Sequence, residues 1–318
     1  SQSRGLGDVY KRQGDPLIEF IQRGNKTEVN TFPNEPFKSY FSGNTVQICP
    51  VGALTSTSYR FKARPWDLKS IRSTCNGCPT GCSIELNSSQ NKMLRILGVD
   101  NDAVNQGWMC DKGRYNFEYL NSDSRLKTPL KMMEDELVEI EIQDVYSELT
   151  EFIKDRQTKV NFLLGSNLTN EDYVAFREFS KTISQSETSF YFNDDLLYRG
   201  FFDDNIELAK IDDLNSSDAI VVWAEDLKEK LPVLYLRIRQ AVKNGVKLVV
   251  FGHTNETLSD IADVFYGKDM VSENFEILKD LSKMKEINNL VVGKNITAIL
   301  GKSTPFQSDE SVATVSYT

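Results

Sequence analysis

The sequence predicts an α/β protein in which a small β-rich domain that carries cysteines precedes a parallel sheet. Beyond about residue 131, short apolar runs alternate with helix-like runs, which is typical of a parallel sheet covered on both faces. All five cysteines lie between residues 49 and 110, ahead of that pattern. We therefore divide the chain into residues 1–13, 14–67, 68–130 and 131–318.

Length and composition exclude several classes of function. The 318 residues suffice for two or more domains, and 40% hydrophobic with 26% charged residues describe an ordinary globular protein. A net charge of −9 argues against a nucleic-acid partner, and no run approaches the ~20 apolar residues of a membrane span. The single histidine, His253, is interpreted as a loop or packing residue, which disfavours histidine-dependent catalysis.

The first thirteen residues are interpreted as foreign to the fold. Residues 8–13 can be encoded by the transposase mosaic end of sequencing libraries, and residues 315–318 can be encoded by its other strand. An adapter translation has not been selected to bury side chains, so we expect residues 1–13 to lack specific packing. On this interpretation the chain is an internal fragment, and the disfavoured alternative is a natural polar arm.

Residues 14–67 are rich in glycine, proline, asparagine and aromatic residues, with one helix-like run at residues 16–22. Cys49 precedes Pro50, which resembles the Cys-Pro ending of ferredoxin cluster motifs, where three other thiolates lie upstream. Those three cysteines are not in this chain, and a buried free cysteine is the alternative. The alternation in residues 59–66 predicts a strand with a solvated basic face.

The remaining four cysteines have the spacing of a metal centre. Three of them occur in Cys75-Asn-Gly-Cys78-Pro-Thr-Gly-Cys82, a loop too short to direct their thiols to different places. Cys110 supplies a fourth thiolate, and four cysteines are the usual ligands of a 4Fe–4S cluster. Structural zinc is the alternative, although zinc more often takes two separated Cys-x-x-Cys pairs.

A hairpin accounts for the gap between the third and fourth cysteines. Residues 83–87 and 92–97 read as short strands, with a polar turn between them at 87–91. The thiolates require a dry shell, for which the candidates are Ile84, Leu86, Met93 and Trp108. Lys112 and Arg114 place cations where they favour the reduced cluster, and solvated charges are the alternative interpretation.

The C-terminal pattern predicts strands at residues 159–165, 218–223, 246–252 and 296–301. It predicts helices at residues 144–155, 170–183 and 231–244, and a short helix beginning at 258–262. Glycines at 165, 252 and 301 place loops at the carboxyl edge of the sheet, where such sheets usually bind ligands. No Gly-x-Gly-x-x-Gly or Walker motif is present, because Gly301-Lys-Ser303 lacks the upstream glycine.

These motifs together resemble a known family. The run Phe41-Ser-Gly-Asn-Thr-Val-Gln-Ile-Cys-Pro-Val-Gly-Ala-Leu-Thr55, with residues 59–66, resembles the G subunit of bacterial NADH–quinone oxidoreductase, respiratory complex I. The four-cysteine set, Cys110-Asp-Lys-Gly113 and residues 124–130 are similar to the 4Fe–4S domain of molybdopterin oxidoreductases. Residues 232–237 and 245–250 look like the α/β body behind that domain. The resemblance covers residues 14 to about 304 and is stronger up to residue 130.

The resemblance implies an electron-transfer role without a catalytic residue in this chain. Residues 14–67 are then the C-terminal part of a ferredoxin-like domain, 68–130 the 4Fe–4S domain, and 131–318 a partial molybdopterin-oxidoreductase-like domain. Cys49 is implied to be the last ligand of one 4Fe–4S cluster whose other ligands are missing. The other four cysteines are implied to hold an additional 4Fe–4S cluster found in some bacterial versions.

The implied partners are other peripheral-arm subunits, on the cytoplasmic side of the bacterial inner membrane, and the large domain is expected to hold no molybdopterin. The second hypothesis is the catalytic subunit of a molybdopterin enzyme such as NAD-linked formate dehydrogenase. The absence of cysteine after Cys110 disfavours it, although Asp or Ser can also ligate molybdenum. A zinc-stabilised scaffold without redox activity is the third.

Overall fold

A computed structural model describes the chain as two compact units, Ser1–Asn121 with Gly200–Thr318, and Ser122–Arg199. The described residues are 19–31, 37, 39–49, 52–154, 160–165, 168–183, 186–190, 208–224, 226–251, 256–266 and 285–300. Predictions for residues 1–13, Gly252, His253, Gly301 and residues 315–318 lie outside these ranges. Within the ranges, no helix is long and apolar enough to cross a membrane.

The first unit begins with a two-stranded hairpin. Strand β1 (Glu19–Ile21) pairs antiparallel with β2 (Glu28–Asn30) across the short 3₁₀ helix η1 (Gly24–Lys26). The helix predicted at residues 16–22 is therefore wrong over 19–21, since so short a run cannot offset the cost of nucleating a helix. Helix α2 (Ser42–Ile48) follows, and the sequence did not predict it.

The strand predicted at residues 59–66 is also wrong. Residues 57–62 form turns, and η2 (Pro65–Asp67) follows them. Phe61 has a φ of 62°, and the Asp67 carboxylate accepts the Arg64 N–H at 3.4 Å. Pro65 has no N–H to give to a ladder, so the chain turns here instead of extending. The first strand after this turn is β3 (Lys69–Thr74).

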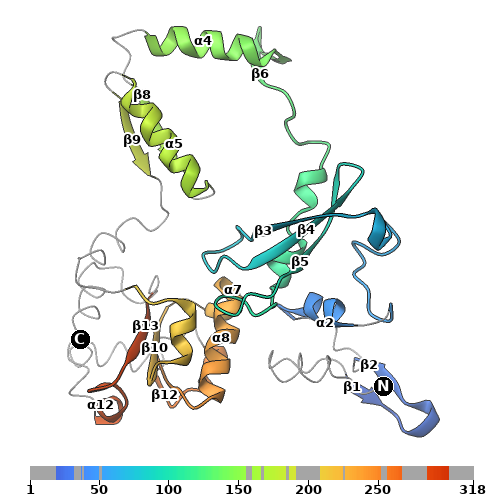
Figure 1. Ribbon diagram of the computed structural model, residues 1–318, viewed down its shortest axis with the longest axis vertical. Helices are drawn as coiled ribbons and strands as arrows, with labels where there is room; N and C mark the ends of the chain where they lie inside the picture. Colours follow the sequence, from blue (N-terminus) through green and yellow to red (C-terminus); the bar gives the residue numbers. More distant parts are fainter. Residues whose placement is uncertain are drawn as a thin grey trace. The chain divides into compact units, whose positions relative to one another are not determined.

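Three antiparallel strands carry the cysteine region, in the order β3-β4-β5 (Figure 1). The predicted hairpin is confirmed as β4 (Ser83–Ser89) and β5 (Lys92–Gly98). Its two-residue turn has positive φ at both Gln90 and Asn91, the geometry that suits the twist of a hairpin. Helix α3 (Asp111–Tyr115) and η3 (Glu118–Asn121) follow. The core of this region is small: Ile84, Ile96, Met109 and Phe117.

The rest of the first unit is the predicted parallel α/β body. Its sheet has the order β12-β11-β10-β13, and every described pair is parallel. The strands are β10 (Ala219–Trp223), β11 (Lys247–Phe251), β12 (Val264–Tyr266) and β13 (Ile296–Leu300). The described helices are η4 (Ile211–Asn215), α7 (Leu227–Lys230), α8 (Pro232–Lys243), α9 (Glu256–Ser259) and α12 (Lys285–Val291).

Alternate residues of the central strand β10 belong to two different apolar clusters. Ile220 and Val222 pack in one apolar cluster with residues of α8, whereas Val221 and Trp223 pack in another with residues of α12. All five residues of β10 are buried, as expected of a parallel strand with both faces covered. The sequence predicted β10, β11 and β13 but not the three-residue β12.

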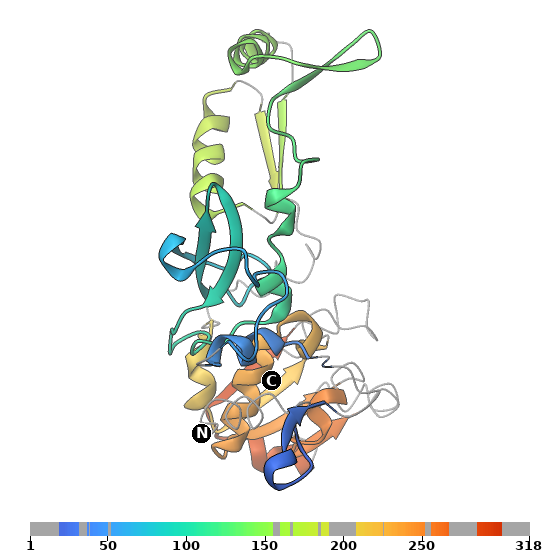
Figure 2. The same cartoon turned by 90° about the vertical axis from the view of Figure 1, so that its right-hand side faces the viewer.

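The second unit contains a hairpin, a helix and a βαβ element. The hairpin is β6 (Leu130–Met133) with β7 (Glu136–Glu139), and helix α4 (Ile142–Lys154) follows. Strands β8 (Val160–Leu164) and β9 (Ser186–Phe190) are parallel and joined through α5 (Asn170–Lys181), shown yellow-green in Figure 2. These elements confirm the helices predicted at 144–155 and 170–183 and the strand predicted at 159–165.

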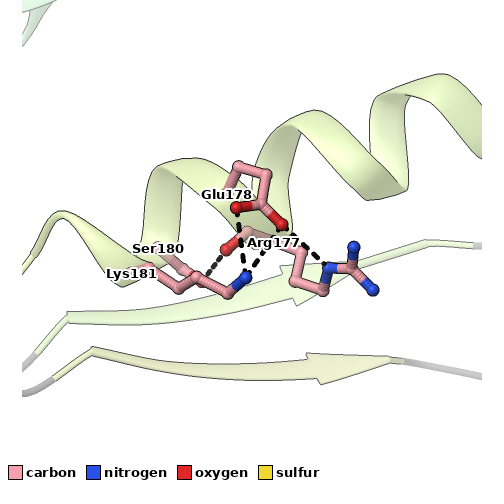
Figure 3. Close-up of polar contacts among 4 residues, drawn as sticks. All are labelled: Arg177, Glu178, Ser180 and Lys181. Atoms are coloured by element: carbon pink, nitrogen blue, oxygen red, sulfur yellow. Dashed lines mark hydrogen bonds and ion pairs between the residues drawn. The ribbon is translucent and has the colours of Figure 1, made fainter.

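Helix α5 shows why the sequence folds this way locally. Thr169 caps its N-terminus, accepting the Asp172 N–H at 3.2 Å, while Asp172 accepts the Thr169 N–H at 2.9 Å. One face packs on β8, where the Phe162 ring lies 5.8 Å from that of Phe179. Near its C-terminus, Glu178 pairs with Lys181 at 2.9 Å and with Arg177 at 3.2 Å (Figure 3). These pairs lower the pKa of Glu178, with the hydrogen bond from Lys181 as the main cause.

Candidate metal centre

The first three cysteines lie on the loop that joins β3 to β4. The Cys75 N–H donates to the Cys82 carbonyl at 2.8 Å, so these two residues close the loop just beyond the ladder. Inside it, the Gly81 N–H donates to the Cys78 carbonyl at 3.3 Å, and Gly81 has a φ of +62° that suits glycine. Cys82 is buried, while Cys75 and Cys78 are half-buried.

Cys110 approaches the same place from the other side, at the start of α3. Its side chain caps that helix, because the Gly113 N–H donates to Cys110 Sγ at 3.4 Å. A Cβ added at Gly113 would lie 2.9 Å from Cys75 Sγ and 3.7 Å from Cys110 Sγ. Both sulfurs therefore lie close to Gly113, and the contact with Cys75 Sγ leaves no room for a side chain there.

The pKa values of Cys75, Cys82 and Cys110 are raised, in part by charges on other members of the four-cysteine set. Burial is the main cause that raises the pKa of Cys82, and charges on Cys78, Cys110 and Cys75 raise it further. Burial also raises the pKa of Cys75 and of Cys110, against hydrogen bonds from the Gly77 and Gly113 N–H groups that lower them. A metal or cluster that binds thiolates would take the place of the thiol protons at this site.

Four cysteine thiols can hold either an iron–sulfur group or a single zinc ion. Among the described residues, no group of three or more His, Cys, Asp or Glu side chains is arranged to hold one metal ion. A zinc ion draws its thiolates to about 2.3 Å from a single centre, whereas a 4Fe–4S cluster spreads its four cysteines around a larger body.

The four predicted shell residues are divided between two apolar clusters, each of which includes or contacts one of the cysteines. Cys75, Leu86 and Met93 are partly buried and pack against the apolar cluster that contains Ile84. Trp108 instead belongs with Cys110 to the larger cluster that also includes Phe41 and strands of the α/β body. Two apolar clusters thus contact the cysteines. Sequence reasoning did not predict that the larger one, shared with the α/β body, would be involved.

Cys49 lies elsewhere, at the C-terminal end of α2. Its N–H donates to the Thr45 carbonyl at 3.2 Å, and it is half-buried. The charges that raise the pKa of Cys75, Cys82 and Cys110 come from within the four-cysteine set and, for Cys110, also from Asp111. Helix α2 is nevertheless docked beside that set, because Asn44 Nδ2 donates to the Met109 carbonyl at 2.8 Å and Asn44 Oδ1 accepts the Met109 N–H at 3.2 Å.

The two candidate cations have different environments. Lys112 is exposed, whereas only 5% of Arg114 is exposed. Arg114 Nη2 donates to Asn44 Oδ1 at 2.7 Å, and Nη1 donates to Gln47 Oε1 at 2.7 Å and to the Ile96 carbonyl at 3.3 Å. The solvated alternative therefore fits Lys112 and is wrong for Arg114.

Several polar residues that position the site were missed by sequence reasoning. Asn105 is fully buried, and its Nδ2 group donates to the Ser83, Val99 and Trp108 carbonyls while Oδ1 accepts the Ser83 N–H. Asp111 accepts hydrogen bonds from the Ser42 N–H at 2.7 Å and the Gly43 N–H at 2.8 Å. The adjacency of Asp111 to Cys110 was a usable signal, but nothing local marked Asn105.

Comparison with protein families gives three matches along the chain. Residues 10–55 match the ferredoxin-like domain of NADH-quinone oxidoreductase subunit 3. Residues 68–122 match the molybdopterin oxidoreductase Fe4S4 domain, and residues 125–312 match molybdopterin oxidoreductase itself.

Curated relatives agree with these matches. The G subunit of NADH-quinone oxidoreductase from Streptomyces coelicolor is 42% identical over 169 residues, 53% of this chain and 20% of that protein. Subunit 3 of the Thermus thermophilus enzyme is 33% identical over 232 residues, 73% of this chain and 29% of that one. The NADPH-Fe(3+) oxidoreductase subunit alpha of Geobacter sulfurreducens is 28% identical, over 74% of this chain and 29% of that one. The chain thus spans less than a third of the length of these relatives.

A solved structure supports the fold alone. Acetylene hydratase from Pelobacter acetylenicus superposes with a TM-score of 0.50 at 14% identity, over 78% of this chain and 38% of that one. The molybdopterin oxidoreductase match covers more than half of the sequence. The chain therefore belongs to the molybdopterin oxidoreductase family and is a homologue of the G subunit of NADH-quinone oxidoreductase.

Proposed function

We propose that this chain is part of an iron–sulfur electron-transfer subunit of a NADH–quinone oxidoreductase, in which Cys75, Cys78, Cys82 and Cys110 hold one 4Fe–4S cluster. The observation that carries the proposal is that Cys75 Sγ and Cys110 Sγ both lie close to Gly113, while charges on Cys78, Cys110 and Cys75 act on the pKa of Cys82. The relatives named as the G subunit of NADH-quinone oxidoreductase support it.

The residues of this chain bind, shield and tune instead of acting as acid, base or nucleophile. A bound cluster supplies one-electron transfer without making or breaking substrate bonds. Ile84 and Met109 exclude water from one side, at 4% and 1% exposed. The N–H groups of Gly77 and Gly113 donate to Cys75 and Cys110 Sγ, which spreads the negative charge of the thiolates.

Cys49 is proposed as the last ligand of a second 4Fe–4S cluster, whose other ligands are not in this chain. Its place at the end of α2, inside the segment that matches the ferredoxin-like domain, supports this role. The proposed domain boundaries remain 14–67, 68–130 and 131–318. The proposed partners are the other peripheral-arm subunits of the complex, on the cytoplasmic side of the bacterial inner membrane, and no molybdopterin is expected in the large domain.

The test is anaerobic reconstitution with iron and sulfide, followed by metal analysis and electron paramagnetic resonance of the reduced protein. We expect about four iron and four sulfide per chain for the complete site. Cys78→Ala is expected to abolish the reduced-cluster signal and leave the α/β body folded, while Cys49→Ala is the matched control that keeps the signal. One zinc per chain, without iron or acid-labile sulfide, would refute the electron-transfer role of this site.

A molybdopterin-dependent catalyst is the second candidate function, because residues 125–312 match molybdopterin oxidoreductase. It predicts that the chain purified from a pterin-producing host contains molybdenum. The proposed electron-transfer function predicts iron and sulfide without molybdenum, so the same metal analysis separates the two.

A further inference from the structure

Arg114 is a buried cation whose hydrogen-bond acceptors are all neutral. Its three donor contacts go to the side-chain oxygens of Asn44 and Gln47 and to the Ile96 carbonyl. Its Nε atom is buried and has no hydrogen-bond partner. A guanidinium group with 5% exposure has lost most of its hydration, and neutral acceptors return only part of that free energy.

The acid closest in sequence is already engaged. The Asp111 carboxylate accepts the N–H groups of Ser42 and Gly43, at the start of α2. Among the ion pairs formed by the described residues, none involves Arg114. Burial lowers the pKa of Arg114, and the nearby Asp111 charge acts against that shift, but the two side chains form no ion pair within the described part of the chain.

The four-cysteine site, one helical turn away along the chain, is a second source of negative charge near Arg114. Arg114 follows Cys110 by one helical turn, and its N–H donates to the Cys110 carbonyl at 3.0 Å. Four thiolates around an iron–sulfur core carry net negative charge, and a fixed cation in a poorly hydrated site interacts with it strongly. We propose that Arg114 is the fixed counter-charge of the four-cysteine cluster and a determinant of its reduction potential, held in place by helix α2.

Helix α2 fixes the guanidinium by contact as well as by hydrogen bonds. Gly43 packs so closely that an added Cβ would overlap Arg114 Cδ and Nε, so the helix needs glycine at this position. Asn44 links the two sides, because its Oδ1 accepts from both Arg114 and the Met109 N–H. The helix that ends at Cys49 thus positions the charge beside the other cysteine site.

The sign of the effect follows from the charge of the cluster. Reduction adds an electron, so a nearby positive charge stabilises the reduced form more than the oxidised form and raises the potential. A buried charge is screened little by salt, whereas the charge of the exposed Lys112 is screened by water and salt. Arg114 is therefore expected to act strongly and independently of salt, and Lys112 weakly.

This inference rests on the proposed cluster, so the experiment begins with the reconstituted unchanged chain. Its cluster is titrated by electron paramagnetic resonance at fixed applied potentials, beside Arg114→Gln, Arg114→Lys and the matched control Lys112→Gln. For Arg114→Gln we expect a tenfold lower ratio of reduced to oxidised cluster, which corresponds to about 59 mV for one electron. Arg114→Lys is expected to restore most of the ratio, and the small effect of Lys112→Gln is expected to vanish in high salt.

The outcomes separate the two proposals. An unchanged chain without iron and sulfide would overturn the proposed function, and this inference with it. A loaded cluster with the same ratio in Arg114→Gln and in the unchanged chain would overturn this inference alone, as would an Arg114→Lys variant that behaves like Arg114→Gln. If Arg114→Gln fails to hold a cluster, the Arg114→Lys variant provides the test. A cluster retained in Arg114→Lys would support the counter-charge role of Arg114, and loss of the cluster in both variants would refute it.

Discussion

The cysteine region and the α/β body of the first unit are held together in different ways. In the body, every residue of β10 is buried and large apolar clusters cover both faces of the sheet. In the cysteine region, every residue of β3 is exposed, and the local cluster has only four buried members. What joins the cysteine region instead is a set of buried side-chain to backbone hydrogen bonds, centred on Asn44, Asn105 and Arg114.

This difference indicates that different interactions stabilise the two regions. Apolar burial is non-directional and tolerates small shifts, so we expect the body to fold on the strength of its apolar clusters. A small core contributes little free energy, and small regions of this kind commonly depend on a bound metal. We therefore expect the proposed cluster to contribute much of the free energy of unfolding of the cysteine region. In the body, we expect the buried apolar side chains to contribute it.

Removal of the metal is expected to have the largest effect, and it tests most directly whether the two regions are stabilised separately. Chelating the iron from a reconstituted protein is expected to expose the amides of β4, β5 and α3 to hydrogen exchange, because metal ligation can contribute about 10 kcal/mol to a small domain. The amides of β10 and β11 are expected to keep their protection. Equal loss in both regions, measured by mass spectrometry, would show that the two fold as one.

A substitution that creates a cavity in the α/β body is expected to have the next largest effect on the free energy of unfolding. Leu248 is fully buried in β11, so Leu248→Ala is expected to lower the free energy of unfolding by about 3 kcal/mol. Ile71→Ala on the exposed strand β3 is the control, with a change within about 0.5 kcal/mol. Denaturant unfolding measures both, and comparable losses would contradict the contrast between the two sheets.

Loss of the Asn105 side chain tests the polar network. Asn105→Ala leaves the Ser83 N–H and three carbonyls without this partner, for an expected loss of about 2 kcal/mol in the cysteine region. Asn121 makes two similar bonds to the backbone of Met93 but is exposed, so Asn121→Ala is expected to cost about 0.5 kcal/mol. Hydrogen exchange of β4 and β5 distinguishes the two, and an equal effect would assign no special role to buried Asn105.

The smallest expected effect concerns pH in the body. Burial acts to raise the pKa of Asp263, but hydrogen bonds from Lys247 and the Leu248 N–H outweigh it, and the pKa lies below its usual value. The ionised group therefore stabilises the fold at neutral pH, and this contribution is lost as the pH falls through the folded-state pKa. Since the pair is largely exposed, about 1 kcal/mol is the upper limit.

Asp263→Asn is expected to flatten the fall in stability of the α/β body below about pH 4. Asp260→Asn is the control, because its pair with Arg239 is longer, at 3.6 Å, and its side chain is 64% exposed. Identical acid unfolding curves for Asp263→Asn and the unchanged chain would show that ionised Asp263 does not stabilise the body.

The sequence alone determined the parts of the fold that depend on local pattern. The three predicted strands of the body and the β4–β5 hairpin formed where apolar periodicity placed them, because side chains that share a face must be buried together. Spacing alone also grouped Cys75, Cys78 and Cys82 on one short loop.

Only the tertiary structure decided which polar side chains serve the candidate site. Arg114 and Lys112 are equivalent in the sequence, yet contacts with Asn44 and Gln47, some seventy residues away, bury one and leave the other in solvent. The same long-range contacts dock helix α2, which local pattern did not predict, and bring Trp108 into the cluster of the body rather than that of Ile84. Hydrogen bonds between distant segments leave no periodicity in the chain, so they become visible only once the segments are packed together.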